Sequence, residues 1–99
     1  MTFVTTQPEL LTAAANQLQG IGSAIDAQNA AAAGPTLGVV PAAADEVSAM
    51  TATQFAAHGA LYQDVSAQAA AIHNFFVQIL RASGASYADT EAANAIAAG

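Results

Sequence analysis

Apolar residues recur at helical spacing along the first third of the chain. They stand alternately three and four residues apart and comprise Leu11, Ala14, Leu18, Ile21 and Ile25. A repeat of this kind places the apolar residues on one seam of an α-helix. The pattern therefore predicts a first helix that fades near Ala33.

A Thr-Gln-Pro-Glu sequence marks the start of this helix. Thr6 and Glu9 have the spacing of a capping box, in which each side chain bonds the backbone N–H of the other residue. Pro8 suits the first turn, where its missing N–H costs no helical bond. Further along, Gly20 and Gly22 either weaken the helix or let another backbone approach closely.

A stretch rich in glycine and proline, residues 34–41, separates this helix from a second one. The second helix is expected to begin at Pro41, with Asp45 and Glu46 placing negative charge near its N-terminus. It is expected to end at Ser83, because the glycine that follows is typical of the position after a last turn.

The remaining residues, 85–99, are small and polar. Chain ends of this composition are usually poorly ordered unless something holds them. The sequence therefore predicts a helical hairpin domain over residues 1–84 and a flexible C-terminal tail over residues 85–99, with some helical tendency over residues 87–98.

Large apolar residues of the second helix fall on three adjacent rows, which together are wider than one helix–helix contact. The rows are Val65, Ile72 and Ile79; Leu61 and Phe75; and Phe55, Tyr62 and Phe76. One row can face the first helix, and the pattern does not say which. The other rows then face solvent or a second protein.

The energetics favour a second protein. Ordering a residue costs about 1.5 kcal/mol, and the residues between the large ones are mostly alanine, which offers little area to bury. A hairpin of this kind gains enough buried area by completing a four-helix bundle. We therefore expect an all-α fold, a two-helix antiparallel hairpin that pairs with a partner. Self-pairing as a homodimer satisfies the same pattern.

Charge and composition narrow the class of partner. The formal net charge is −6, the only Lys or Arg is Arg81, and there is no cysteine. Nucleic acids and anionic membrane surfaces attract basic proteins and are excluded as partners. The most apolar helical stretch, residues 65–80, is shorter than the roughly 20 residues that span a bilayer. The first nine residues lack the basic and apolar regions of a signal peptide.

No set of residues has the spacing of a catalytic or metal site. His58 and His73 are fifteen residues apart, whereas zinc sites gather three or four close ligands. The Gly-Ile-Gly-Ser sequence at 20–23 is not a nucleophile elbow. We therefore expect no enzymatic activity, no metal and no cofactor.

Three short motifs resemble those of the mycobacterial PE proteins. Phe3-Val4 precedes Pro8-Glu9, the pair that names the family, and an alanine-rich hairpin with a Gly/Pro connection follows. Tyr87-Ala88-Asp89-Thr90-Glu91 fits the Tyr-x-x-x-Asp/Glu signal of type VII secretion substrates. The resemblance covers essentially the whole chain, as a PE domain without a large C-terminal extension.

The resemblance implies a partner and a route of export. PE proteins of this kind pair with PPE proteins in an antiparallel four-helix bundle, and the folded pair leaves the cytoplasm through an ESX type VII system for the cell surface or the medium. An EspG-type chaperone binds the PPE subunit. Tyr87 and Glu91 would then be the secretion signal, and Pro8 and Glu9 the family motif. The partner-binding residues would be Leu11, Leu18, Ile21, Ile25, Phe55, Leu61, Tyr62, Val65, Ile72, Phe75, Phe76 and Ile79.

Two other functions compete with this one. A self-associating hairpin would resemble the Trp-x-Gly secreted proteins, but the chain contains no Trp. A component of a cell-surface solute channel is a second alternative, since some PE/PPE pairs are proposed to admit small solutes.

Overall fold

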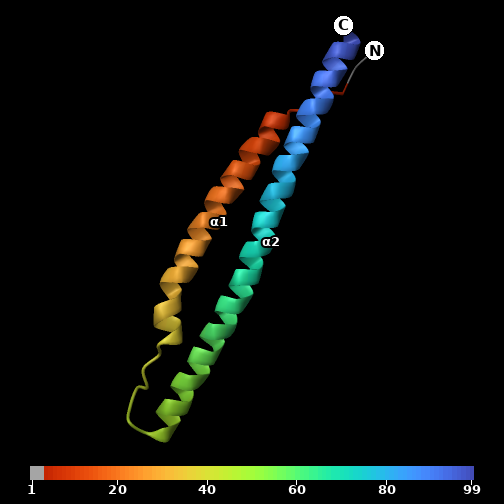
Figure 1. The fold of residues 1–99 in the computed structure, drawn as a ribbon. Helices are drawn as coiled ribbons and strands as arrows, with labels where there is room; N and C mark the ends of the chain where they lie inside the picture. The colour runs from red at the N-terminus through yellow and green to blue at the C-terminus, as the bar shows by residue number, and fades with distance from the viewer. Residues whose placement is uncertain (1–3) are drawn as a thin grey trace. The chain divides into compact units, whose positions relative to one another are not determined.

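Two long helices form the protein. The structure is a computed structural model that describes residues 4–99, so Phe3 of the family motif lies outside the described residues. Helix α1 spans Pro8–Leu37 and helix α2 spans Glu46–Ala98, and the described residues contain no strand (Figure 1). The predicted all-α helical hairpin is confirmed.

The chain divides into two compact units, and each contains a stretch of both helices. The terminal unit joins Met1–Gly22 to His73–Gly99, and the central unit is Ser23–Ile72. In each unit the two stretches run antiparallel.

The helices begin where side chains or proline satisfy the first turn. Pro8 is the first residue of α1, as predicted. Helix α2 begins at Glu46 rather than at Pro41, because Asp45 is its cap. Asp45 Oδ1 accepts a hydrogen bond from the backbone N–H of Ser48 at 2.8 Å, and Oδ2 accepts one from the Ser48 hydroxyl at 2.8 Å. Both hydrogen bonds lower the pKa of Asp45, and the bond from the backbone N–H has the larger effect.

The predicted capping box at the start of α1 is not formed. Thr6 uses both its backbone N–H and its hydroxyl to donate to Glu91, 85 residues away. The Leu10 N–H donates instead to the carbonyl of Gln7 at 3.0 Å. Tertiary contact with α2 therefore replaces the local cap that the sequence pattern predicts.

Helix α1 continues one turn past the predicted end near Ala33 and stops at Leu37, with Pro35 inside its last turn. Proline removes one backbone donor from that turn. The hydroxyl of Thr36 donates to the carbonyl of Ala32 at 2.6 Å. This side-chain bond adds a donor in the turn that contains the proline.

Helix α2 does not end at Ser83, as predicted, but passes through Gly84 and continues to Ala98. Gly84 is buried, and a Cβ atom there would lie 3.1 Å from Thr12 Oγ1 and 3.4 Å from the carbonyl of Pro8. The glycine thus serves close packing against α1, not chain termination. The segment predicted as a flexible tail is helical as far as Ala98.

Small, polar and branched apolar residues together form the contact between the helices in the terminal unit. The positions turned inward are Pro8, Leu11, Ala15, Leu18 and Gly22 on α1, and His73, Val77, Leu80, Gly84 and Glu91 on α2. His73 Nε2 lies 2.6 Å from the carbonyl of Leu18, so this nitrogen carries the proton and donates. A Cβ atom on Gly22 would lie 2.7 Å from the His73 ring, whereas one on Gly20 would meet nothing within 4 Å. Gly22 therefore permits a close approach, and Gly20 does not.

The contact in the central unit is built in the same way. Its inward positions are Asn29, Ala32 and Ala33 on α1, and Ala52, Ala56, Gly59, Gln63, Ser66 and Ala70 on α2. Asn29 accepts a hydrogen bond from the Tyr62 hydroxyl at 2.6 Å and, through its carbonyl, one from the Gln63 amide at 3.1 Å. A Cβ atom on Gly59 would lie 2.7 Å from the carbonyl oxygen of Thr36. The backbones therefore meet most closely at glycine.

None of the three apolar rows of α2 faces α1, which corrects the expectation that one row would do so. The inward positions alternate three and four residues apart along α2, but small residues occupy most of them. The seam on α1 is corrected as well. Leu11, Ala14 and Leu18 are half-buried in it, but Ala15 is the buried residue between the two leucines. Gly22, not Ile21, follows Leu18 in the seam. Small residues occupy most of the contact between α1 and α2 because they let the two backbones approach closely.

The contrast between Gly59 and Gly20 provides a stability test. Gly59→Ala places a Cβ atom against the carbonyl oxygen of Thr36. The cost of this overpacking outweighs the higher helix propensity of alanine, so we expect the free energy of unfolding to fall by about 1–2 kcal/mol. Gly20→Ala, the matched control, points into open space and should raise that free energy by up to about 1 kcal/mol. Thermal unfolding followed by circular dichroism measures both, on the protein with any partner that it needs to stay in solution. Equal effects of the two substitutions would contradict the assigned seam.

Candidate functional site

Each unit has an apolar surface on its own stretch of α2. Every residue of the three predicted rows is between 47% and 70% exposed. The central unit contributes Phe55, Leu61, Tyr62, Val65 and Ile72, and the terminal unit contributes Phe75, Phe76 and Ile79. On α1, Ile21 and Ile25 are also about half exposed. The fully buried apolar residues, by contrast, are only Ala15, Ala52 and Val77 among the residues that the structure describes.

The apolar surface in the terminal unit lies on one side of the seam and on the back of α2. Successive residues of a helix are about 100° apart, so Phe76 projects to one side of the inward-facing Val77, and Phe75 and Ile79 point away from α1. Arg81 and Asn74 project to the other side. The terminal unit therefore has an apolar face and a polar edge rather than apolar residues all round.

Arg81 crosslinks the two helices on the polar edge. Its guanidinium Nη2 donates to Asn16 Oδ1 at 3.0 Å and also to Gln19 Oε1. Arg81 is the only Lys or Arg of the chain. The protein thus places its one guanidinium in an intramolecular contact, away from the apolar face.

The accessible surface of the chain is larger than that of a self-contained domain. It amounts to 7267 Å². A compact folded chain of this mass exposes about 5,200 Å², so the surplus is roughly 2,000 Å². The exposed large apolar side chains of both helices account for part of this surplus.

Tyr87 and Glu91 lie one helical turn apart on α2, beyond Gly84. The Tyr87 side chain is 47% exposed. Glu91 is not free, because its Oε1 accepts the hydroxyl and the backbone N–H of Thr6, both at 2.8 Å. Both hydrogen bonds lower the pKa of Glu91, and the bond from the hydroxyl has the larger effect. The two signal candidates therefore differ: one side chain is available, and the other holds the N-terminal segment.

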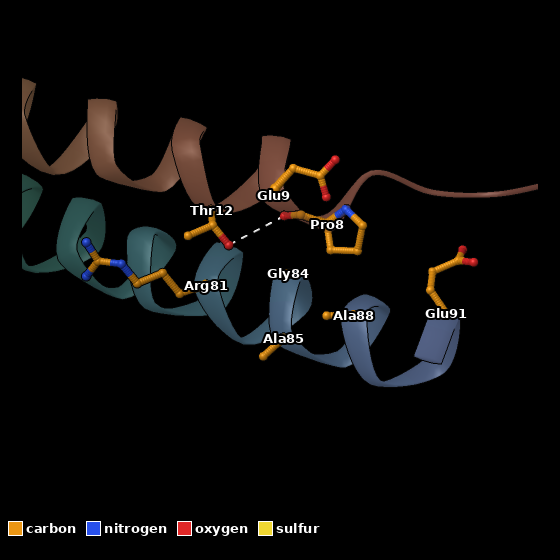
Figure 2. A pocket seen from close by; sticks show the side chains of 8 residues that line it. All are labelled: Pro8, Glu9, Thr12, Arg81, Gly84, Ala85, Ala88 and Glu91. Atoms are coloured by element: carbon orange, nitrogen blue, oxygen red, sulfur yellow. Dashed lines mark hydrogen bonds between the residues drawn. The ribbon is translucent and has the colours of Figure 1, made fainter. Parts of the chain in front are cut away.

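Pro8 and Glu9 border a shallow groove at the same end of the terminal unit. Figure 2 shows its lining residues, which are Pro8, Glu9, Thr12, Arg81, Gly84, Ala85, Ala88 and Glu91. The Thr12 hydroxyl donates to the carbonyl of Pro8 at 3.4 Å, and the Glu9 carboxylate points away from α2. Small residues on α2 form the floor, so the first turn of α1 rests directly on the α2 backbone. The Pro-Glu pair and Glu91 thus belong to one local structure.

The next question is whether the described residues contain a metal site or a histidine that is free to act. Among residues 4–99, no three His, Cys, Asp or Glu side chains are grouped as a metal site would require. His58 is exposed, and His73 is engaged in the seam. In the same part of the chain, neither helix has a stretch apolar enough to cross a bilayer.

Comparison with known proteins settles the family. The model of the PE family matches residues 4–94. The chain belongs to the PE family. PE family protein PE13 of Mycobacterium tuberculosis is 64% identical over 98 residues, which cover 99% of both chains. PE family protein PE8 of the same organism is 55% identical over 98 residues.

Relatives of this PE protein differ greatly in length. The chain covers 36% of PE8 and 19% of the PE-PGRS family protein PE_PGRS33 of M. tuberculosis, to which it is 56% identical over 95 residues. The helical hairpin is thus the part that these proteins share with the present chain.

Sequence reasoning missed two features of this PE domain. Positions 52, 56, 59, 63, 66 and 70 alternate four and three apart and are small residues except for Gln63. This spacing is a signal from which the seam could have been predicted. The hydrogen bond between Thr6 and Glu91 joins residues 85 positions apart. No pattern of neighbouring residues in the sequence predicts such a bond.

The bond between Thr6 and Glu91 should depend on pH. A carboxyl group whose pKa is lowered in the folded state stabilises that state above its unfolded pKa, and the stabilisation is lost as pH falls through the folded pKa. We expect the Thr6 amide proton signal to titrate with a midpoint below pH 4.5, the ordinary value for glutamate. Nuclear magnetic resonance measures this shift, and Glu91→Gln should abolish the titration. A midpoint at or above the ordinary value would contradict the bond.

Proposed function

We propose that this PE protein is a non-enzymatic subunit that pairs with a PPE-family protein and carries the signal for export of the folded pair through an ESX type VII system. The exposed apolar face carries this proposal. It holds eight large apolar side chains of α2, whereas the intramolecular seam uses only Val77 and Leu80 among the large apolar residues of that helix. Membership of the PE family supports a PPE protein as the partner.

The size and position of the face favour a helical partner. Long rows at heptad spacing suit a second helical pair, which packs into them as in a four-helix bundle. Burial of each Leu, Ile or Phe on the face contributes about 1.5–3 kcal/mol. The partner thus supplies the core that the hairpin lacks.

Export is the second half of the proposal. Tyr87 is exposed on α2, one turn before Glu91, so one receptor surface can contact both residues. The pair would form in the cytoplasm and then be secreted or held at the cell surface. An EspG-type chaperone would act through the PPE subunit, which leaves the end of α2 available to the ESX machinery.

A charge on the apolar face tests the pairing. Phe76→Asp removes the burial of an aromatic ring and places an unpaired carboxylate in the interface, which costs several kcal/mol. We expect its affinity for the PPE partner to fall by at least about a hundredfold, corresponding to about 2.7 kcal/mol. The matched control is Asn74→Asp, which adds the same charge two residues away on the polar edge and should leave pairing unchanged. Co-purification after co-expression, followed by titration calorimetry, measures both.

Three results would count against the pairing. Undiminished binding by both Phe76→Asp and Ile72→Asp would show that the wrong face has been assigned. The wild-type chain expressed alone should be insoluble or molten, so a cooperatively melting monomer would also contradict the proposal. A stable dimer of two copies of the chain would favour self-association.

Removal of the exposed tyrosine tests the export signal. Tyr87→Ala should leave the complex intact, because the side chain lies beyond Gly84 and outside the apolar rows. We expect the intact complex to remain in the cytoplasm. Cell fractionation measures export, and size-exclusion chromatography of the purified pair is the control for assembly. Normal secretion of the variant would refute the signal, and loss of the complex would show that Tyr87 is structural.

A further inference from the structure

The segment before α1 lies along the last turns of α2. Thr6 donates to Glu91, and Val4 and Thr5 line a hollow together with Glu91 and Asn94. Helix α1 begins only at Pro8, which packs on Gly84. Beyond that point the neighbour of α2 within the terminal unit is therefore this short N-terminal segment, not a helix.

Without a neighbour, the end of a helix frays, because an isolated helical turn is marginal in water. Thr6 supplies two donors to one carboxylate oxygen, and hydrogen bonds to a charged group are stronger than neutral ones. The carboxylate also lies near the first turn of α1, where the helix dipole favours negative charge. These contacts hold the turn of α2 that carries Glu91 and fix its side chain.

The arrangement leaves part of Glu91 available. Both bonds from Thr6 end on Oε1, and among the described residues none donates to Oε2. Tyr87 is exposed one turn earlier. A receptor that reads both residues would therefore meet a tyrosine and a carboxylate oxygen at a defined spacing on an ordered helix.

On the basis of the export function proposed above, we propose that Thr6 is a positioning residue of the export signal, which holds Glu91 and its helical turn in the form that the secretion machinery recognises. Thr6 itself need not touch the receptor. The alternative role for the same contact is a mask that withholds Glu91 until the N-terminal segment is released. The two roles predict opposite changes in export.

Substitution of threonine by valine separates the hydroxyl from the rest of the contact. Thr6→Val keeps the β-branched shape and the backbone N–H but removes the hydroxyl donor. Thr6→Ser keeps the donor and is the conservative control. Thr5→Val makes the same chemical change one residue away, at a hydroxyl that bonds none of the described residues. All three variants are tested as the full chain in complex with its partner.

Two measurements are made on each variant. Amide hydrogen exchange over residues 87–95 reports order at the end of α2, and Thr6→Val should speed it about threefold to tenfold, the range for the loss of one hydrogen bond. Cell fractionation reports export, and the secreted fraction should fall for Thr6→Val while size-exclusion chromatography shows an intact pair. Thr6→Ser and Thr5→Val should resemble the wild type in both measurements.

Several outcomes would overturn the positioning role. Unchanged exchange in Thr6→Val would mean that the contact does not order the helix end. Faster exchange with normal export would make the contact structural only, and increased export would make it a mask. Hydrogen exchange does not depend on secretion, and Tyr87→Ala tests the export signal separately. Blocked export in Tyr87→Ala with normal export in Thr6→Val would therefore refute this inference alone.

Discussion

The close approach of two helix backbones through a seam of small residues is the constraint on which the rest of this structure depends. Gly22 leaves room for the His73 ring, Gly59 for the carbonyl of Thr36, and Gly84 for the first turn of α1. A large side chain at any of these positions would separate the helices. All the aromatic residues of α2 and most of its branched ones thereby stay out of the seam and remain on the surface.

This exclusion gives the hairpin its two different sides. In the terminal unit, Phe76 and Ile79 lie on one side of the seam, and the guanidinium of Arg81 joins Asn16 and Gln19 on the other. Polar crosslinks of this kind stabilise the pair of helices only modestly, because they are exposed to water. The free energy that is missing from the hairpin is available on the apolar face. The proposed pairing with a second protein rests on this face.

The same packing logic explains the end of α2. Its neighbours in sequence alone predict that the helix ends before Gly84, since glycine is common just after the last turn of a helix. In the folded chain Gly84 lies under Pro8 and Thr12, and the helix continues to Ala98. Thr6 shows the converse case. A residue with the local pattern of a helix cap gives both of its donors to a carboxylate far along the chain.

Periodicity, breakers and composition were enough to establish the helical hairpin, the approximate position of its connection and the excess of apolar rows on the second helix. Those properties are local, because helix formation and the spacing of Val65, Ile72 and Ile79 depend on neighbours three to seven residues away. Tertiary structure alone decided which positions meet. Small residues displaced the large rows from the seam because backbone proximity, which hydropathy does not register, governs how two alanine-rich helices pack. It also decided that Gly84 lies inside a helix and that Glu91 is bound to Thr6. Each of these depends on space or partners that no short stretch of sequence specifies.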